Sequence, residues 1–286
     1  MQINKNITSK KKALDLLKPN IMGILNVTPD SFSDGNQYNN IDSALYHVEH
    51  MIKDGADIID IGGESTRPNA DKVSLQEEID RVLPIVEKII SNFDVIISVD
   101  TSKPEIMKLV LSKGVSIIND VRALRLDNAI NVIAKYNPMV ILMHMLAEPK
   151  IMQKVIIKEN VYSNVVSDIR NYLKKRADAC INAGISSKNI ILDPGFGFGK
   201  SFEDNAHILN NLNEFSDLGY PLAVGLSRKS MISCALGEKY TVDKRLYPSI
   251  ALAVMSVLNG AKIIRTHDVK ATREACEIAH KVQEHD

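Results

Sequence analysis

Short apolar runs recur along the chain, and the segments between them carry apolar residues at helical spacing. Each run is too short for a free-standing helix, and most are rich in Ile, Val and Leu, a composition typical of strands buried on both faces. Eight such runs occur, at residues 21–27, 57–61, 95–99, 115–118, 139–143, 190–192, 222–226 and 261–264. Segments with helical spacing and charged faces include 75–91, 104–113, 161–183 and 245–259. The pattern predicts a strand and a helix alternating eight times.

This alternation within one domain length predicts an α/β fold, a TIM (β/α)8 barrel, with a doubly wound open sheet as the alternative. Polar residues follow the apolar runs directly: Asn26, Gly62-Gly63-Glu64, Asp100, Asn119, His144, Asp193, Ser227 and Arg265. A barrel brings the carboxyl ends of all its strands to one rim, whereas an open sheet spreads them along a line. The barrel is therefore favoured, with the active site at its C-terminal rim.

The chain is predicted to form one domain over residues 1–286, with a core at about 18–275. No linker, low-complexity tract or repeat divides it. Residues 1–17 are expected to form an N-terminal arm or a plug of the barrel.

The composition excludes several partners. Lys and Arg number 35, as do Asp and Glu, so no broad field attracts nucleic acid or an anionic membrane. No run of eighteen apolar residues occurs, and the lysine-rich N-terminus lacks a signal-peptide core. Cys180, Cys234 and Cys276 lie too far apart for a CxxC motif. Reduced thiols and a cytoplasmic location are therefore expected.

The stretch DPGFGFGKS at 193–201 looks like a nucleotide-binding loop but fails both patterns. A P-loop needs glycine five residues before Gly199, where Pro194 stands, and a dinucleotide loop needs GxGxxG instead of GxGxG. Alternating Gly and Phe suggests unusual backbone dihedrals and aromatic faces near a flat ligand. The alternative for Phe196 and for Phe198 is packing into the core.

Three polar residues at the rim suit a nitrogen heterocycle. Ser102 and Glu105 are predicted to form a capping box with Pro104 in the first helical turn, which leaves Asp100 facing the rim. Asn119 and Asp193 could each be plain turn residues. Together the two carboxylates and the amide supply the acceptors and donors that the edge of such a ring requires.

Cations follow the last two strands. Residues 227–230, SRKS, are predicted to begin a helix whose N-terminus, with Ser227, holds a carboxylate while Lys229 reaches a ring oxygen or nitrogen. The alternative is a solvated lysine. Arg265 and His267, with Thr66 and Arg67 from the second loop, can hold phosphate oxygens.

A metal is expected only together with a phosphorylated ligand. Asn26 offers a neutral carbonyl oxygen, and no Asp, Glu and His at ligand spacing accompany it, so Mg²⁺ arriving with a diphosphate fits better than a transition metal. His144, between Met143 and Met145, is ambiguous and is not predicted to be catalytic, because the methionines could simply pack the barrel mouth.

These motifs closely resemble those of the dihydropteroate synthase family across residues 20–270. The matching stretches are LNVTPDSFSDG (25–35), DIGGESTRP (60–68), SVDTSKP (98–104), IIND (117–120), MHM (143–145), ILDPGFGFGKS (191–201), GLSRKS (225–230) and RTHDV (265–269). The family condenses 6-hydroxymethyl-7,8-dihydropterin diphosphate with 4-aminobenzoate in folate biosynthesis. The resemblance implies a magnesium-assisted transferase that releases diphosphate, and a homodimer.

The resemblance also implies roles for individual residues. Pterin binding falls to Asp100, Asn119, Asp193 and Lys229, diphosphate binding to Thr66, Arg67, Arg265 and His267, and Mg²⁺ binding to Asn26. Ser227 would anchor the aminobenzoate carboxylate, Phe198 and Pro68 would line its ring pocket, and Met143 is counted among the substrate-binding residues. Catalysis would rest on Asp100, Asp193, Lys229, Arg265 and His267.

Several positions depart from the family pattern: Asn36, Asn69, Ala147, Ile151 and Pro248. They bear on loop dynamics more than on the reaction. Two other functions remain to be weighed, the pterin-binding domain of a corrinoid-dependent methyltransferase and a catalytically idle pterin-binding subunit. The SFSDG and STRP loops and the SRKS anion seat argue against the methyltransferase domain. Asn26, Arg67, Lys229 and Arg265 argue against the idle subunit, because binding a pterin alone would not require them.

Overall fold

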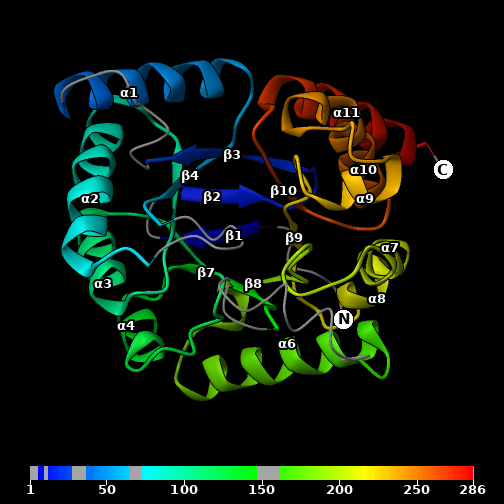
Figure 1. Ribbon diagram of the computed structural model, residues 1–286. Helices are drawn as coiled ribbons and strands as arrows, with labels where there is room; N and C mark the ends of the chain where they lie inside the picture. Colours follow the sequence, from blue (N-terminus) through cyan, green and yellow to red (C-terminus); the bar gives the residue numbers. More distant parts are fainter. Residues whose placement is uncertain (1–5, 10–11, 28–36, 65–71, 147–161, 286) are drawn as a thin grey trace.

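The computed structural model describes residues 6–9, 12–27, 37–64, 72–146 and 162–285. A ring of helices surrounds a parallel sheet of eight strands (Figure 1). The strands are β3 (Asn20–Asn26), β4 (Ile58–Gly62), β5 (Ile96–Asp100), β6 (Ile117–Asp120), β7 (Met139–Met143), β8 (Ile190–Asp193), β9 (Ala223–Val224) and β10 (Ile263–Thr266). Their order is β8-β7-β6-β5-β4-β3-β10-β9, and a parallel bridge joins Leu192 of β8 to Leu222, the residue before β9. The sheet is therefore closed, and the predicted TIM barrel is confirmed.

The helices follow the strands in sequence and cover the outside of the barrel. They are α1 (Gln37–Lys53), α2 (Leu75–Asn92), α3 (Pro104–Lys113), α4 (Ala129–Tyr136), α6 (Val165–Asn182), α7 (Phe202–Asn210), α8 (Leu212–Ser216), α9 (Met231–Leu236), α10 (Leu246–Leu258) and α11 (Val269–Gln283). None of these described helices is both long and apolar enough to cross a membrane.

Helix α2 shows how local sequence sets these elements. Ser74 caps its N-terminus, since the Ser74 side chain accepts a hydrogen bond from the backbone N–H of Glu77 at 3.2 Å. Val82, Ile85, Val86 and Ile89 form the buried stripe that packs on the barrel. Capping thus fixes where the helix begins, and the stripe fixes which face turns inward.

The start of α3 differs from the predicted capping box. Lys103 is the N-cap and makes no side-chain cap bond, while Pro104 occupies the first turn. Ser102 instead donates a hydrogen bond to the buried carboxylate of Asp120. The prediction was wrong because a buried acceptor on the neighbouring strand competes for the same hydroxyl.

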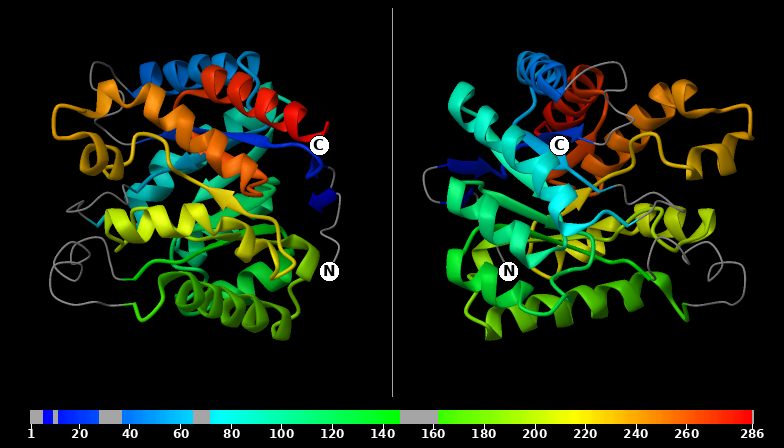
Figure 2. Two further views of the ribbon diagram at one scale, coloured as in Figure 1. Left: turned by 90° about the vertical axis from the view of Figure 1, so that its right-hand side faces the viewer. Right: turned by 60° about the vertical axis from the view of Figure 1, so that its left-hand side comes forward.

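The barrel interior changes from apolar to polar along its axis. The part near the amino ends of the strands is filled by a cluster of apolar strand residues that includes Met22, Ile58 and Ile117. Leu14 and Leu16 join this cluster from the hairpin of β1 (Asn6–Ser9) and β2 (Lys12–Asp15). The hairpin lies at one end of the barrel in both views of Figure 2. Apolar packing closes that end and leaves the opposite rim for polar groups.

Candidate active site

The strand register places the predicted rim residues side by side. Asn26 pairs with Gly62, Gly62 with Asp100, and Asp100 with Asn119, so one row crosses β3 to β6. On the far side of β7, Met143 pairs with Asp193. Residues separated by up to 167 positions in the sequence therefore meet at one rim.

A charged network links this row to the last strand. The guanidinium of Arg265 donates from Nε to Asp60 Oδ2 at 2.6 Å and from Nη2 to Asp100 Oδ2 at 3.2 Å. Burial raises the pKa of Asp100 to about 7, and the nearby Arg265 opposes this shift. The pKa of Arg265 is raised because the attraction of Asp60 and Asp100 outweighs its burial. The guanidinium therefore stays charged between two carboxylates.

Asp60 is a site residue that the sequence analysis missed. Its carboxylate is fully buried and also accepts a hydrogen bond from Asn119 Nδ2 at 3.2 Å. A usable signal was present, because a single carboxylate interrupts the apolar run Ile58–Gly62 at a position that alternation turns into the barrel. The buried Asp120 and Lys200 were likewise not assigned roles.

The loop after β8 explains why 193–201 only looks like a phosphate loop. Lys200 is buried, and its Nζ donates to the backbone oxygens of Gly195 at 2.6 Å, Phe198 at 3.2 Å and His144 at 3.4 Å. Burial lowers the pKa of Lys200 to about 7, and in its protonated form these carbonyls accept all three of its donors. The lysine braces its own loop and is not available to a phosphate.

The glycines of this loop adopt the left-handed dihedrals that the alternating pattern suggested. Gly195, Gly197 and Gly199 have φ values of 72°, 80° and 74°. A Cβ on Gly195 would lie 1.9 Å from the carbonyl oxygen of His144, and one on Gly197 would lie 3.3 Å from Lys229 Cδ. The loop thus lets the backbone approach β7 and lets Lys229 lie across it.

The two phenylalanines of the loop have different places. Phe196 is 1% exposed and belongs to the main core. Phe198 packs against Val121, Met143 and Met145, and Lys229 Nζ lies 4.2 Å from the centre of its ring. Phe198 therefore presents an aromatic face beside a cation.

Lys229 faces the carboxylates from the opposite wall. Burial and the charge of Arg265 lower its pKa to about 8, while Asp193 and Asp100 act against this. Burial raises the pKa of Asp193, and its bond from the N–H of Gly195 at 2.7 Å, together with Lys229, opposes the rise. The two side chains lie close enough to shift each other's protonation.

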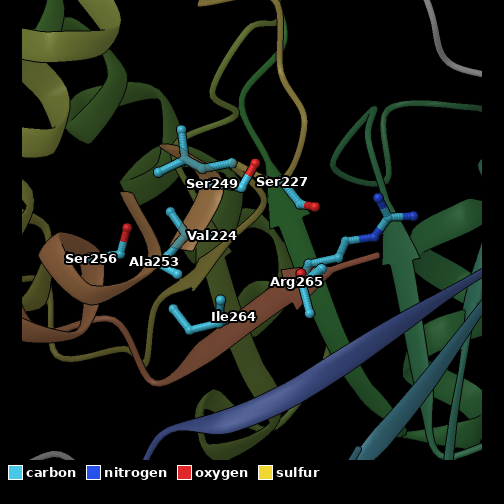
Figure 3. Close-up of a pocket in the computed structure, with 9 residues that line it drawn as sticks. Val224, Ser227, Ser249, Ala253, Ser256, Ile264 and Arg265 are labelled. Atoms are coloured by element: carbon cyan, nitrogen blue, oxygen red, sulfur yellow. The ribbon is translucent and has the colours of Figure 1, made fainter. Parts of the chain in front are cut away.

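Ser227 lies beside His267. Ser227 Oγ accepts from the backbone N–H of His267 at 3.2 Å and lies 3.0 Å from its Nδ1. The hydroxyl and Nδ1 are thus joined, and Nε2 is the ring nitrogen that Ser227 does not bind. Figure 3 shows Ser227 near Arg265, whose side chain extends away from Ser249 and Ala253 of α10.

The segment 227–230 does not begin a helix, contrary to the prediction. Helix α9 starts at Met231 and spans only six residues, and Arg228 has a φ of 57°. The turn is fixed by other contacts: the Arg228 N–H donates to Ser249 Oγ, its guanidinium to Asp268, and Arg245 donates to its carbonyl oxygen. Tertiary hydrogen bonds thus replace the expected helix N-terminus as the support for Ser227 and Lys229.

His144 lies behind the rim. Its ring packs edge-on against Tyr172, with centroids 4.8 Å apart, and burial lowers its pKa to about 2. The ring is therefore neutral and packs behind the rim.

Asn26 can offer one neutral oxygen at the rim. A Cβ on Gly62 would lie 3.8 Å from Asn26 Oδ1 and 3.7 Å from Asp100 Cβ, so the amide oxygen faces the same row as Asp100. Within the described ranges no cluster of three His, Cys, Asp or Glu could hold a metal ion. One neutral oxygen suits Mg²⁺ that keeps its water and takes its other ligands from a substrate.

Thr66, Arg67 and Pro68 lie outside the described residues, as do Asn36, Asn69, Ala147 and Ile151. The structure therefore places ten of the predicted site residues at or beside the rim: Asn26, Asp100, Asn119, Met143, Asp193, Phe198, Ser227, Lys229, Arg265 and His267.

Two cavities in the described part of the chain do not mark this site by their size. One of about 10 Å³ borders the site, since Ser227 and Arg265 line it together with Ser249 and Ala253, and it has room for a single water molecule (Figure 3). The other, of about 470 Å³, lies between Phe93 and Gly114 at the amino ends of β5 and β6. The polar rim is thus identified as the candidate active site by its side chains and not by the size of a cavity.

Comparison with known proteins identifies the family. Residues 22–267 match the family model of pterin binding enzymes. The dihydropteroate synthase of Haemophilus influenzae is 50% identical over 270 residues, which cover 94% of this chain and 96% of that protein.

Two solved structures extend the agreement to the fold. The Yersinia pestis dihydropteroate synthase, crystallised with a sulfonamide drug complex, superposes with a TM-score of 0.91 at 45% identity, covering 98% of this chain and 99% of the other. The Xanthomonas albilineans enzyme in complex with 7,8-dihydropteroate gives a TM-score of 0.87 at 37% identity, covering 97% and 98%. The chain belongs to the dihydropteroate synthases, within the family of pterin-binding enzymes.

Proposed function

We propose that the rim of this barrel condenses 6-hydroxymethyl-7,8-dihydropterin diphosphate with 4-aminobenzoate, the reaction of the family, and that its polar residues divide the work among the two substrates and the leaving group. The observation that carries the proposal is that a wall of acidic and amide side chains faces a wall of basic side chains. The buried Asn119 and the partly buried Asp100 and Asp193 lie across from the partly buried Lys229 and Arg265 at one mouth.

The pterin ring would bind to the carboxylate wall. Its amino and ring N–H groups need acceptors, which Asp100, Asp193 and the Asn119 carbonyl supply, while Lys229 donates to a ring oxygen or nitrogen. Desolvated carboxylates gain strongly from such donors because few other partners are available to them. Burial raises the pKa values of Asp100 and Asp193, so donors from a bound ring would favour their charged forms.

The diphosphate would lie toward Arg265 and His267, with Thr66 and Arg67 adding contacts from the second loop. Two of the five guanidinium donors of Arg265 are used by Asp60 and Asp100, so others remain for phosphate oxygens. Asn26 would hold Mg²⁺, which when bound neutralises diphosphate charge and makes it a better leaving group.

The aminobenzoate would enter last. Ser227 would anchor its carboxylate, with Phe198 and Pro68 against its ring and Met143 at the boundary with the pterin. Ser227 is held between the backbone and ring of His267, which orients its oxygen before the substrate arrives. In this arrangement the arylamine would lie above the pterin methylene.

The reaction then needs positioning and charge more than a general base. The bond between the methylene carbon and the diphosphate oxygen breaks, and Asp100 and Asp193 stabilise the positive charge left on the pterin. The arylamine nitrogen bonds to the methylene carbon and loses a proton to solvent. Arg265 and His267 stabilise the departing diphosphate.

The direct test mixes the purified chain with pterin diphosphate, 4-aminobenzoate and Mg²⁺ and follows dihydropteroate and diphosphate together. Equal amounts of both products, lost on addition of a chelator and restored by Mg²⁺, are expected. Diphosphate release without dihydropteroate, or bound pterin with no release, would contradict the proposal and favour an idle pterin-binding subunit.

A plot of kcat/KM for pterin diphosphate against pH should be a narrow bell-shaped curve. Pterin N–H groups need Asp100 as a carboxylate, which forms above a pKa of about 7, and Lys229 must carry its proton, which it keeps below a pKa of about 8. The kcat/KM for pterin diphosphate should therefore rise to a maximum between these values and fall on both sides. Rates measured from about pH 5.5 to 9.5 test this, with Lys229→Arg as the comparison.

The Lys229→Arg variant should lose the alkaline limb while keeping the acid limb, because a guanidinium stays charged across this range. A profile that is flat between pH 6 and 9 in the unchanged protein would contradict the assignment of either group.

We also propose that the chain is a cytoplasmic homodimer. Among the described residues, α10 exposes Tyr247, Met255 and Leu258, and the neighbouring α11 exposes Ile278 and Val282. Exposed apolar side chains on two packed helices are typical of a subunit interface. All three cysteines are free, as expected in a reducing compartment. Sedimentation showing a monomer at micromolar concentration would refute the dimer.

A further inference from the structure

We infer that Asp60 is a positioning residue for this reaction, acting through Arg265 and Asn119 without touching either substrate. The inference rests on the proposed function. It starts from one carboxylate oxygen, Asp60 Oδ2, which accepts from Arg265 Nε at 2.6 Å and from Asn119 Nδ2 at 3.2 Å. A phosphate-binding group and a pterin-binding group are thus held by the same atom.

Burial keeps Asp60 away from the substrates. Its side chain is 0% exposed, whereas Arg265 is 25% and Asp100 is 11% exposed. It lies one layer below the rim, paired in register with Ile24 of β3 and Ser98 of β5, while the rim row is Asn26, Gly62 and Asp100. Any effect on catalysis must therefore pass through the residues that it binds.

Two anchor points are needed to fix the plane of a guanidinium. Asp100 alone would hold Arg265 at Nη2, and the group could pivot about that contact. The second bond, at Nε, comes from Asp60. It restricts the rotation of the Arg265 guanidinium and its distance from the bottom of the barrel. The donors left on Nη1 then have a defined direction, which a diphosphate oxygen needs.

The amide of Asn119 is fixed by the same contact. An asparagine side chain can present either its oxygen or its nitrogen to a ligand. Because Nδ2 donates to Asp60, the Oδ1 atom is the one turned away from Asp60. Asp60 therefore also determines that Asn119 offers its acceptor oxygen to the pterin.

Stability alone does not account for this carboxylate. Its second oxygen, Oδ1, is buried with no hydrogen-bond partner among the described residues, and the same holds for Ser98 Oγ on the adjacent strand. A buried ion pair with an unsatisfied oxygen is a poor source of stability, since desolvation offsets much of the attraction. Its clearest consequence is the fixed geometry of its partners.

Asp60 also influences protonation at the rim. Its negative charge is among the causes that raise the pKa of Asp100, together with burial and the charges of Asp120 and Glu78, while Arg265 acts in the opposite sense. Neutralising Asp60 should therefore lower the pKa of Asp100, and the acid limb of the pH profile should move to lower pH. A residue with a purely structural role would leave that limb in place.

The test uses Asp60→Asn, which keeps the shape and removes the charge. We expect kcat/KM for pterin diphosphate to fall about 10- to 100-fold, the range known for groups that orient a binding residue. The KM for 4-aminobenzoate should stay within about twofold, because Ser227 is held by His267 and not by this network. The acid limb should shift downward in the same variant.

Asp57→Asn is the matched control. Asp57 stands three residues earlier at the foot of the same strand and pairs with Arg273 of α11, outside the site. Both variants remove one carboxylate from an aspartate–arginine pair. Asp57→Asn should alter the thermal midpoint but leave both substrate KM values and the pH profile unchanged.

A double-mutant comparison shows the route of the effect. In an Arg265→Lys background, Asp60→Asn should lower kcat/KM for pterin diphosphate much less than in the unchanged protein. The reason is that lysine lacks the guanidinium that Asp60 orients. Equal losses in both backgrounds would overturn the inference. So would a folded Asp60→Asn variant with unchanged kinetics and an unmoved acid limb.

Failure of folding and failure of the proposed function can be told apart. If Asp60→Asn does not fold, Asp60→Glu keeps the charge and displaces the carboxylate by one methylene, and the same selective loss for the pterin substrate is expected. If the unchanged protein makes no dihydropteroate, the proposed function fails. If it is active and both Asp60 variants match it, only the role of Asp60 fails.

Discussion

Replacing Asp193 with asparagine should lower kcat/KM for pterin diphosphate by about 10²- to 10³-fold. The asparagine oxygen can still accept from the N–H of Gly195, so the loop keeps its geometry. What disappears is the negative charge facing Lys229 and the pterin. That charge matters most in the transition state, when positive charge develops on the pterin methylene, so kcat should fall along with kcat/KM.

Steady-state rates with each substrate varied in turn measure this effect. The control is Asp178→Asn, which makes the same chemical change at an exposed pair with Lys174 and should leave the kinetics unchanged. A folded Asp193→Asn variant that retains more than about a tenth of the activity would exclude the proposed charge stabilisation by this residue.

Replacing Gly195 with alanine should destabilise the protein by about 3 kcal/mol or more. The new Cβ would lie 1.9 Å from the carbonyl oxygen of His144, and the φ of 72° is unfavourable for any residue with a Cβ. The loop would have to move away from β7. It carries Phe198 and is braced by Lys200, so activity should be lost together with stability.

Gly114→Ala separates the two causes of that loss. Gly114 also has a positive φ, of 110°, but its Cβ would meet nothing within 4 Å. Chemical denaturation should show a loss of about 1–2 kcal/mol there, from backbone strain alone. Similar losses at the two positions would show that the close approach to His144 relaxes easily.

The strands could be predicted closely because each is buried on both faces and is therefore apolar along its length, whatever its neighbours in the sequence. Every predicted run corresponds to a strand, and 104–113 and 139–143 agree with α3 and β7 at both ends. Boundaries differ mainly where a strand continues through a polar residue, as at Asp100, Asn119 and Asp193. Backbone pairing with the next strand extends the sheet regardless of side-chain polarity.

The two local errors share a physical origin. Ser102 was expected to cap α3 and residues 227–230 to begin a helix, both from short-range preferences. In the folded chain Ser102 binds Asp120, and Arg228 adopts a φ of 57° because Ser249, Arg245 and Asp268 hold it. Partners far away in the sequence outcompete weak local preferences near a rim where many polar groups meet.

The family and its reaction were identified from motifs, and the comparisons confirm both. The sequence by itself determined the eight strands, the polar residue at the end of each, and the failure of the phosphate-loop pattern. These depend on residue type and spacing, which a linear chain carries directly.

Only the tertiary structure decided which polar groups act on one another. It turned Phe196 into the core and Phe198 toward Lys229, folded Lys200 back on its own loop, and joined Asp60 to Arg265 across 205 positions. Hydrogen bonds and ion pairs act over a few ångströms in space, and closure of the barrel sets those distances.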